Sequence, residues 1–156
     1  MDLFVANIDH ERFSLYQNNR DETCDDQANA TAIGAATRLL SGWGLKFFDY
    51  DNDGNLDLFL ANGNPDDMIE TMQKDVTYRE PLMLFHSDGK SLHNVSAESG
   101  PLFARNLSSR GLAIGDFDND GAVDVLVSVN DAAPLPMRNL AAKRNHWLGI
   151  KREGKK

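Results

Sequence analysis

The feature that most constrains the fold is an internal repeat. Residues 43–62, WGLKFFDYDNDGNLDLFLAN, align without a gap with residues 110–129, RGLAIGDFDNDGAVDVLVSV. The first seven residues, MDLFVAN, match LDLFLAN at residues 56–62, and residues 14–19 resemble residues 83–89. A unit of about 67 residues that recurs in this way indicates stacked copies of one supersecondary element, since a single copy cannot bury its own apolar face.

Each unit is predicted to consist of short β-strands. The apolar segments are brief, are rich in aliphatic, β-branched and aromatic residues, and are bounded by Asp, Asn or Gly. Leu45 and Phe47 would lie on one face of their strand and Phe48 on the other, as expected for a sheet covered on both sides. The sequence therefore predicts an all-β fold with strands at residues 43–48, 56–61, 82–86, 112–117 and 123–129.

The remaining segments carry weaker signals. One helical turn is expected at residues 64–70, with Asn64 as its N-cap. Residues 28–40 fit either a loop or a short helix. The repeat pattern stops after Pro136, and residues 144–150 resemble one more strand ahead of a basic tail.

Two loops between paired strands carry the chemistry. Residues 49–57, DYDNDGNLD, and residues 116–124, DFDNDGAVD, both read D-x-D-x-D-G-x-x-D. Carboxylates crowded in this way repel by roughly 1 kcal/mol or more per close pair, so a cation is their natural partner. Acids at loop positions 1, 3, 5 and 9, a backbone carbonyl at position 7 and a glycine at position 6 suit Ca²⁺ and its six to eight oxygen ligands. Neither loop contains Cys or His, which disfavours metals that seek thiolate or imidazole.

Other interpretations of the loops are weaker. One short D-x-D-G match is often only a solvated turn, but two full matches in register favour calcium. An EF-hand requires an acidic ligand at position 12, where this chain has Leu60 and Val127 within strands. Dockerin-type loops fail for the same reason, and the glycine-rich nonapeptide of calcium β-rolls is absent.

Charge and composition exclude several classes of function. Sixteen Lys and Arg stand against 24 Asp and Glu, and the eight loop aspartates account for the whole net charge of −8. Nucleic acid and anionic lipid are therefore not expected partners. No apolar run approaches the roughly 20 residues of a membrane span, and no signal peptide is visible. The single cysteine, Cys24, excludes an internal disulfide and is expected to be a small buried residue.

The sequence GLAIGDFDNDGAVDVLV resembles the FG-GAP or VCBS-type calcium repeat of integrin-like β-propellers, and RNHWLGI resembles the opening of the UnbV (ASPIC) segment of proteins of the cartilage acidic protein type. The chain departs from the repeat pattern at Phe48, which replaces the glycine that Gly115 supplies in the second copy. The resemblance implies a partial β-propeller of about two to two and a half four-stranded antiparallel blades, with a calcium loop joining the first two strands of each blade.

The same resemblance implies which residues would hold two Ca²⁺ ions. The ligands of one ion would be Asp49, Asp51, Asp53 and Asp57 with the carbonyl of Asn55, and those of the other Asp116, Asp118, Asp120 and Asp124 with the carbonyl of Ala122.

The expected organisation is the end of one blade, a complete calcium repeat, a partial second repeat and the start of an UnbV-like segment, at residues 1–42, 43–109, 110–140 and 141–156. The sequence offers no catalytic constellation: the four histidines share no spacing and are expected at the surface or in packing roles. Trp43 and Trp147 are expected to be core or blade-contact residues.

The predicted function is that of a non-catalytic, extracellular or periplasmic calcium-binding module that recognises a protein or carbohydrate ligand. The alternative is a structural or accessory part of a secreted enzyme whose catalytic domain lies outside this chain. Met1 and Asp2 match positions 8 and 9 of a calcium loop, so the remaining blades are expected to belong to a longer chain.

Overall fold

The protein is built from short β-strands with very little helix. The computed structural model describes residues 2–141, 147, 148, 150 and 154. Their strands form four sheets, none closed into a barrel, and the predicted all-β fold is confirmed. Among the described residues, no helix has the length and apolar character that a membrane crossing requires.

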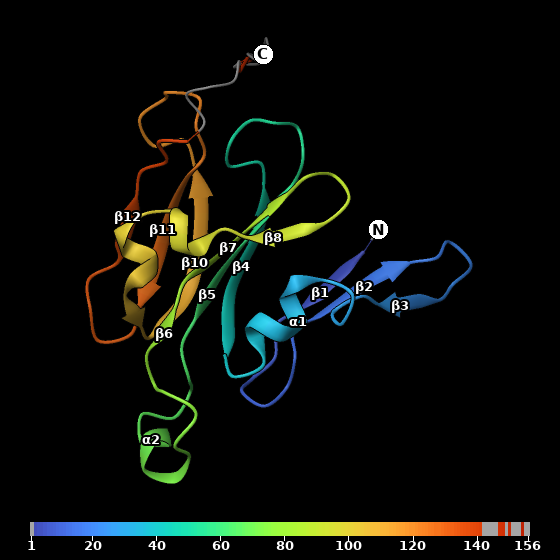
Figure 1. Cartoon of the computed structure of the whole chain (residues 1–156). Helices are drawn as coiled ribbons and strands as arrows, with labels where there is room; N and C mark the ends of the chain where they lie inside the picture. The colour runs from blue at the N-terminus through green and yellow to red at the C-terminus, as the bar shows by residue number, and fades with distance from the viewer. Residues whose placement is uncertain (1, 142–146, 149, 151–153, 155–156) are drawn as a thin grey trace.

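The central sheet has the four antiparallel strands expected of a complete blade. Its order is β4 (Gly42–Phe48), β5 (Asp57–Asn62), β7 (Met83–Ser87) and β8 (Leu92–Asn94). Each strand pairs with its neighbour in the list, and the sheet lies between the two other large sheets (Figure 1). The sequence thus placed β4, β5 and β7 to within a few residues, but it did not predict β8.

The two flanking sheets repeat part of this plan. One contains β1 (Leu3–Val5), β2 (Ser14–Asn18) and β3 (Cys24–Asp26), and the other β10 (Ser109–Gly115), β11 (Asp124–Val129) and β12 (Leu135–Met137). In these sheets β1 pairs antiparallel with β2 and β11 with β12, as β5 pairs with β7. The arrangement is consistent with a partial β-propeller.

Strand β5 of the central sheet is buried on both faces, whereas in β4, on which the prediction of a covered sheet rested, Phe48 is buried but Phe47 is 37% exposed. All six residues of β5 are buried. Phe59 and Ala61 belong to the apolar cluster shared with the β10–β12 sheet, whereas Leu58 and Leu60 belong to the cluster on the opposite side, with Phe13. Because successive side chains of a strand point to opposite faces, one strand supplies both cores.

Several local predictions need correction. The helix expected to begin after Asn64 is α2 (Ile69–Met72), because the Asn64 side chain accepts the N–H of Asp66 and closes a separate turn. α2 projects beyond the end of the central sheet (Figure 1). The ambiguous segment 28–40 contains a short helix, α1 (Ala32–Thr37).

At the sheet edges, one strand was not predicted and one residue differs from its predicted burial. The sequence did not indicate β12, in which Pro136 pairs with Leu126; an edge strand tolerates proline because one side of it needs no donor. Cys24 lies in β3, also an edge strand, and is exposed rather than buried. The strand expected at residues 144–150 falls largely outside the described residues, and Trp147, Leu148 and Ile150 are not in a strand.

Close packing joins the central sheet to the β10–β12 sheet. A Cβ atom added at Gly44 would lie 2.8 Å from the backbone nitrogen of Leu112 and 2.9 Å from the carbonyl carbon of Gly111, so only glycine permits this approach of β4 to β10. The Arg110 guanidinium lies 4.9 Å from the ring centre of Trp43. Trp43 is therefore a contact between blades, as predicted.

A buried carboxyl group lies between these sheets. Glu80 is 1% exposed and lies in β6 (Glu80–Pro81), which pairs with β9 (Asn106–Leu107). Its Oε2 accepts the N–H of Ser41 at 2.8 Å. Burial raises the pKa of Glu80 to about 8, with a further contribution from the charge of Asp9.

Glu80 should make stability depend on pH. Because its folded-state pKa lies above the unfolded value of 4.5, the folded chain holds the proton more tightly, and this stabilisation is lost as pH rises toward about 8. Relative to Glu80→Gln, we expect the wild-type free energy of unfolding in urea to decrease between about pH 4.5 and 8. Glu98→Gln, at an exposed position, is the control. Parallel pH profiles for wild type and Glu80→Gln would show that Glu80 is not protonated in the folded chain.

Candidate metal centre

The two predicted loops occupy equivalent places in neighbouring sheets. Loop 1, residues 49–57, joins β4 to β5, and loop 2, residues 116–124, joins β10 to β11. The loops also touch, since the Asn52 side chain donates a hydrogen bond to the carbonyl of Gly121 at 3.2 Å. Both loops therefore lie at one edge of the assembled sheets.

Both loops have the same backbone conformation. Loop positions 4 and 6 have positive φ angles, 59° at Asn52 and 92° at Gly54 in loop 1 and 55° at Asn119 and 84° at Gly121 in loop 2. Glycine adopts such angles freely, and Asn more readily than most residues. The repeated N-D-G sequence thus turns each loop back on its first aspartate.

The first aspartate of each loop holds that turn. In loop 1 the Asp49 carboxylate accepts the N–H groups of Asp53 at 3.0 Å and Gly54 at 2.8 Å. In loop 2 Asp116 accepts those of Asp120 at 3.1 Å and Gly121 at 3.0 Å. The next carboxylates along each loop are consequently directed toward one region.

The last aspartate of each loop is buried and ties the loop to the adjacent strand. Asp57 accepts the N–H of Tyr50 at 3.0 Å and that of Ser87 at 2.8 Å. Asp124 accepts the equivalent N–H groups, those of Phe117 at 3.0 Å and Asn139 at 2.8 Å. Burial and these bonds fix the ninth position of both loops.

Among the residues that the structure describes, three groups of side chains lie close enough to share an ion. In each group, one ligand atom per residue lies within 4.8 Å of the others. In both loops the backbone N–H of the residue at position 7 donates a hydrogen bond to the aspartate at position 5: Asn55 to Asp53 and Ala122 to Asp120. The three groups are Asp49, Asp51 and Asp53; Asp51, Asp57 and His86; and Asp116, Asp118 and Asp124.

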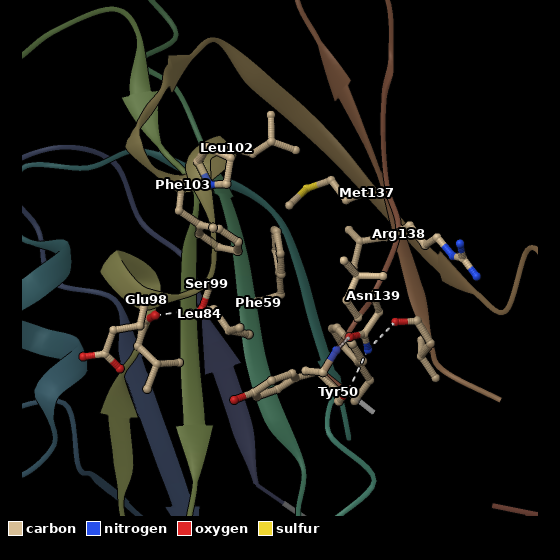
Figure 2. A pocket seen from close by; sticks show the side chains of 18 of the residues that line it. Tyr50, Phe59, Leu84, Glu98, Ser99, Leu102, Phe103, Met137, Arg138 and Asn139 are labelled. Atoms are coloured by element: carbon tan, nitrogen blue, oxygen red, sulfur yellow. Dashed lines mark hydrogen bonds between the residues drawn. The ribbon is translucent and has the colours of Figure 1, made fainter. Parts of the chain in front are cut away.

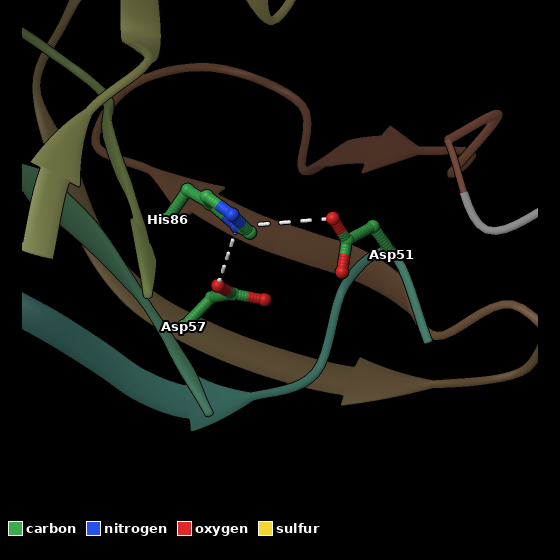
Figure 3. A group of neighbouring side chains, drawn as sticks. All are labelled: Asp51, Asp57 and His86. Carbon is green, nitrogen blue, oxygen red and sulfur yellow. Dashed lines mark hydrogen bonds and ion pairs between the residues drawn. The ribbon is translucent and has the colours of Figure 1, made fainter. Parts of the chain in front are cut away.

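His86 joins loop 1 although the sequence indicates only a surface or packing role for it. Its Nδ1 lies 3.2 Å from Asp57 Oδ1 and 3.7 Å from Asp51 Oδ2 (Figure 3). The residue lies in β7, whose pairing with β5 brings it beside Asp57. Carrying the strand register across from Leu58 would have found it.

Arg138 lies beside the carboxylates of loop 2, as His86 lies beside those of loop 1. Its Nη2 lies 2.6 Å from Asp118 Oδ2 and 3.1 Å from Asp120 Oδ2. Asp120 is the one predicted aspartate that is not in any of the three groups above. Arg138 follows β12, in the segment where the repeat pattern is lost, so no sequence signal indicated it.

Burial and the crowding of carboxylates shift the pKa values of the groups in loop 1. Burial, and then the charges of Asp53 and Asp57, raises the pKa of Asp51. Burial also raises the pKa of Asp57 and raises that of Tyr50 to about 12. The N–H groups of Asn55 lower the pKa of the exposed Asp53. Since crowded carboxylates disfavour their own charged forms, a divalent cation bound here would relieve the repulsion.

An apolar cavity of about 650 Å³ extends from these loops between the two sheets (Figure 2). Tyr50 and Arg138 line it near the loops, with Phe59, Leu84 and Met137 deeper between the sheets. The Asn139 side chain spans its edge, donating hydrogen bonds to the carbonyls of Tyr50 and Val123. Glu98 and Ser99 also line the cavity, so its polar groups are not limited to the residues near the loops.

Comparison with known proteins supports the repeat assignment. A family model described as an FG-GAP-like repeat matches residues 1–60, which end within β5 and include all of loop 1. This match supports an FG-GAP repeat protein; it does not reach the UnbV-like residues 141–156. No curated protein matches the chain.

The buried last aspartate should stabilise the fold even without metal. Asp57→Ala leaves two N–H groups without their acceptor, at about 1–3 kcal/mol for each buried donor, so we expect a loss of about 2 kcal/mol or more in the free energy of unfolding. Asp53→Ala, at an exposed loop position, should change it by less than about 0.5 kcal/mol. Urea unfolding in excess chelator measures both. Equal stabilities for the two variants would contradict the structural role of Asp57.

Proposed function

We propose that the chain is a calcium-binding, non-catalytic module built from FG-GAP/VCBS repeats, with one Ca²⁺ in each loop. The ligands would be those at loop positions 1, 3, 5, 7 and 9. One observation carries the proposal: two loops distant in sequence share the same positive-φ positions and the same hydrogen bonds to their first and last aspartates.

The donor set favours calcium over other ions. The loops offer carboxylate and carbonyl oxygens, the hard ligands of Ca²⁺ and Mg²⁺. Several carboxylate oxygens lie close together in each loop, which suits Ca²⁺, because Mg²⁺ demands near-ideal octahedral geometry and retains more water. Loop 1 adds one imidazole nitrogen from His86 at its margin.

The metal would act structurally. Each loop joins two neighbouring strands, so an ion bound by positions 1 to 9 would lock the start of one strand to the end of the other. Extracellular calcium modules bind at about 10⁻⁴–10⁻³ M, and this range suits an extracellular or periplasmic location. The FG-GAP match over residues 1–60 supports the same setting, because such repeats are usually extracellular.

The recognised ligand is proposed to be a protein or a carbohydrate, bound with the remaining blades of a longer chain. Residues 141–156 are proposed to begin an UnbV (ASPIC) segment, on the strength of RNHWLGI alone.

Calorimetric titration of metal-free protein should show two Ca²⁺ per chain, with affinities of order micromolar to millimolar. Asp53→Ala and Asp120→Ala should each remove about one site, because each deletes a central ligand and leaves the other loop intact. Asp67→Ala, an exposed acid outside the loops, should retain both sites.

Calcium should also raise the melting temperature of the same samples. Saturation to about 100 times the dissociation constant adds roughly 2.7 kcal/mol per site if the unfolded chain does not bind. Absence of calcium binding, together with identical melting in chelator and in calcium, would refute the proposal.

The module is proposed to have no catalytic activity of its own. We expect no hydrolysis of glycosides, esters, peptides or phosphoesters above background in calcium-loaded protein. Turnover that is abolished by Asp53→Ala or Asp120→Ala while the fold persists would instead favour an enzyme.

A further inference from the structure

One residue faces the aspartate that precedes or begins the first strand of a pair in each of the three large sheets: Asp57, Asp124 and Asp2. Leu58 pairs with Phe85 and Val125 with Met137, so one step along each ladder places His86 opposite Asp57 and Arg138 opposite Asp124. The pairing of β1 with β2 places Gln17 opposite Asp2 in the same way. We call Gln17, His86 and Arg138 the facing residues.

The hydrogen bonds confirm that these positions are equivalent. The backbone N–H that follows each facing residue donates to the aspartate opposite it: Asn18 to Asp2 at 3.0 Å, Ser87 to Asp57 at 2.8 Å and Asn139 to Asp124 at 2.8 Å. The backbone is therefore conserved among the three sheets of this chain, whereas the facing side chain changes from an amide to an imidazole to a guanidinium.

These side chains differ in what they can do beside a cation. A neutral imidazole can donate a lone pair to a metal, but a guanidinium is always charged and has no acceptor. Arg138 already contacts two aspartates of loop 2, Asp118 at 2.6 Å and Asp120 at 3.1 Å. It thus occupies carboxylate oxygens that a metal ion would need.

Arg138 is also held in place from both sides. Met137 before it pairs with Val125 in the β11–β12 ladder. Asn139 after it bonds Asp124 through its N–H and the Tyr50 carbonyl through its side chain, at 2.6 Å. Its backbone cannot move far from loop 2, so the guanidinium is presented to the loop at a high effective concentration.

We propose that Arg138 is a built-in competitor for the cation of loop 2. With no ion bound, the guanidinium neutralises Asp118 and Asp120; for Ca²⁺ to bind, it must leave them. Arg138 therefore weakens Ca²⁺ binding by loop 2 and helps the loop keep its shape without the ion. The inference rests on the proposed function, namely that both loops bind calcium.

The test measures one loop at a time by calorimetry with Ca²⁺. In an Asp53→Ala background only loop 2 remains, and adding Arg138→Met should tighten its dissociation constant roughly three- to tenfold, as expected from losing two exposed ion pairs. Methionine removes the charge without supplying an oxygen ligand. Arg138→Lys retains the charge and should stay close to the background value.

The converse variant introduces the competitor into loop 1. In an Asp120→Ala background, His86→Arg should weaken loop 1 binding by a similar factor, whereas His86→Gln should weaken it less. A second readout is stability: Arg138→Met should lower the melting temperature in chelator more than in saturating Ca²⁺. Circular dichroism in saturating Ca²⁺ verifies that each variant is folded.

The outcomes separate this inference from the function on which it rests. One Ca²⁺ in each background with unchanged affinity in both Arg138→Met and His86→Arg would overturn the inference and leave the calcium proposal standing. No Ca²⁺ in either background would overturn both. Tighter binding in Arg138→Met and weaker binding in His86→Arg would establish the facing residue as the determinant of affinity.

Discussion

The buried aspartate that ends each loop is the interaction on which the rest of the structure depends. Asp57 accepts one N–H from the start of its own loop and one from the neighbouring strand β7, and Asp124 accepts one from the start of its loop and one from Asn139, which follows β12. A buried carboxylate requires such donors, because an unsatisfied charge in the interior is costly. Through one side chain, the loop conformation and the register of the adjacent strand pair become coupled.

That coupling matters because both faces of β5 are buried. Leu58 and Leu60 of β5 pack toward the first sheet, and Phe59 and Ala61 pack toward the β10–β12 sheet. A shift of one residue in β5 would exchange these two sets. The loop aspartate and the alternating core therefore specify the same register independently, and the close approach at Gly44 sets how the next sheet stacks on it.

The loops combine this structural role with an excess of negative charge. A different side chain lies beside the carboxylates of each loop. In loop 1 the imidazole of His86 lies beside Asp57 and Asp51, whereas in loop 2 the guanidinium of Arg138 contacts Asp118 and Asp120. A crowded set of carboxylates is balanced either by a bound cation or by a cation from the chain itself. The same aspartate spacing can thus give sites of different cation affinity. The difference is set by a residue outside the loop motif.

The sequence alone determined the all-β class, the strands that flank the loops and the two aspartate clusters, because these depend on local residue spacing. The blade contact at Trp43 followed from the same patterns. The sequence did not reveal β12, the later start of α2 or the exposure of Cys24, since these depend on edge pairing and on a local turn at Asn64. Nor could it place His86 and Arg138 at the loops. His86 is 29 residues from Asp57 along the chain, and only the register of paired strands, fixed by tertiary packing, brings the two together.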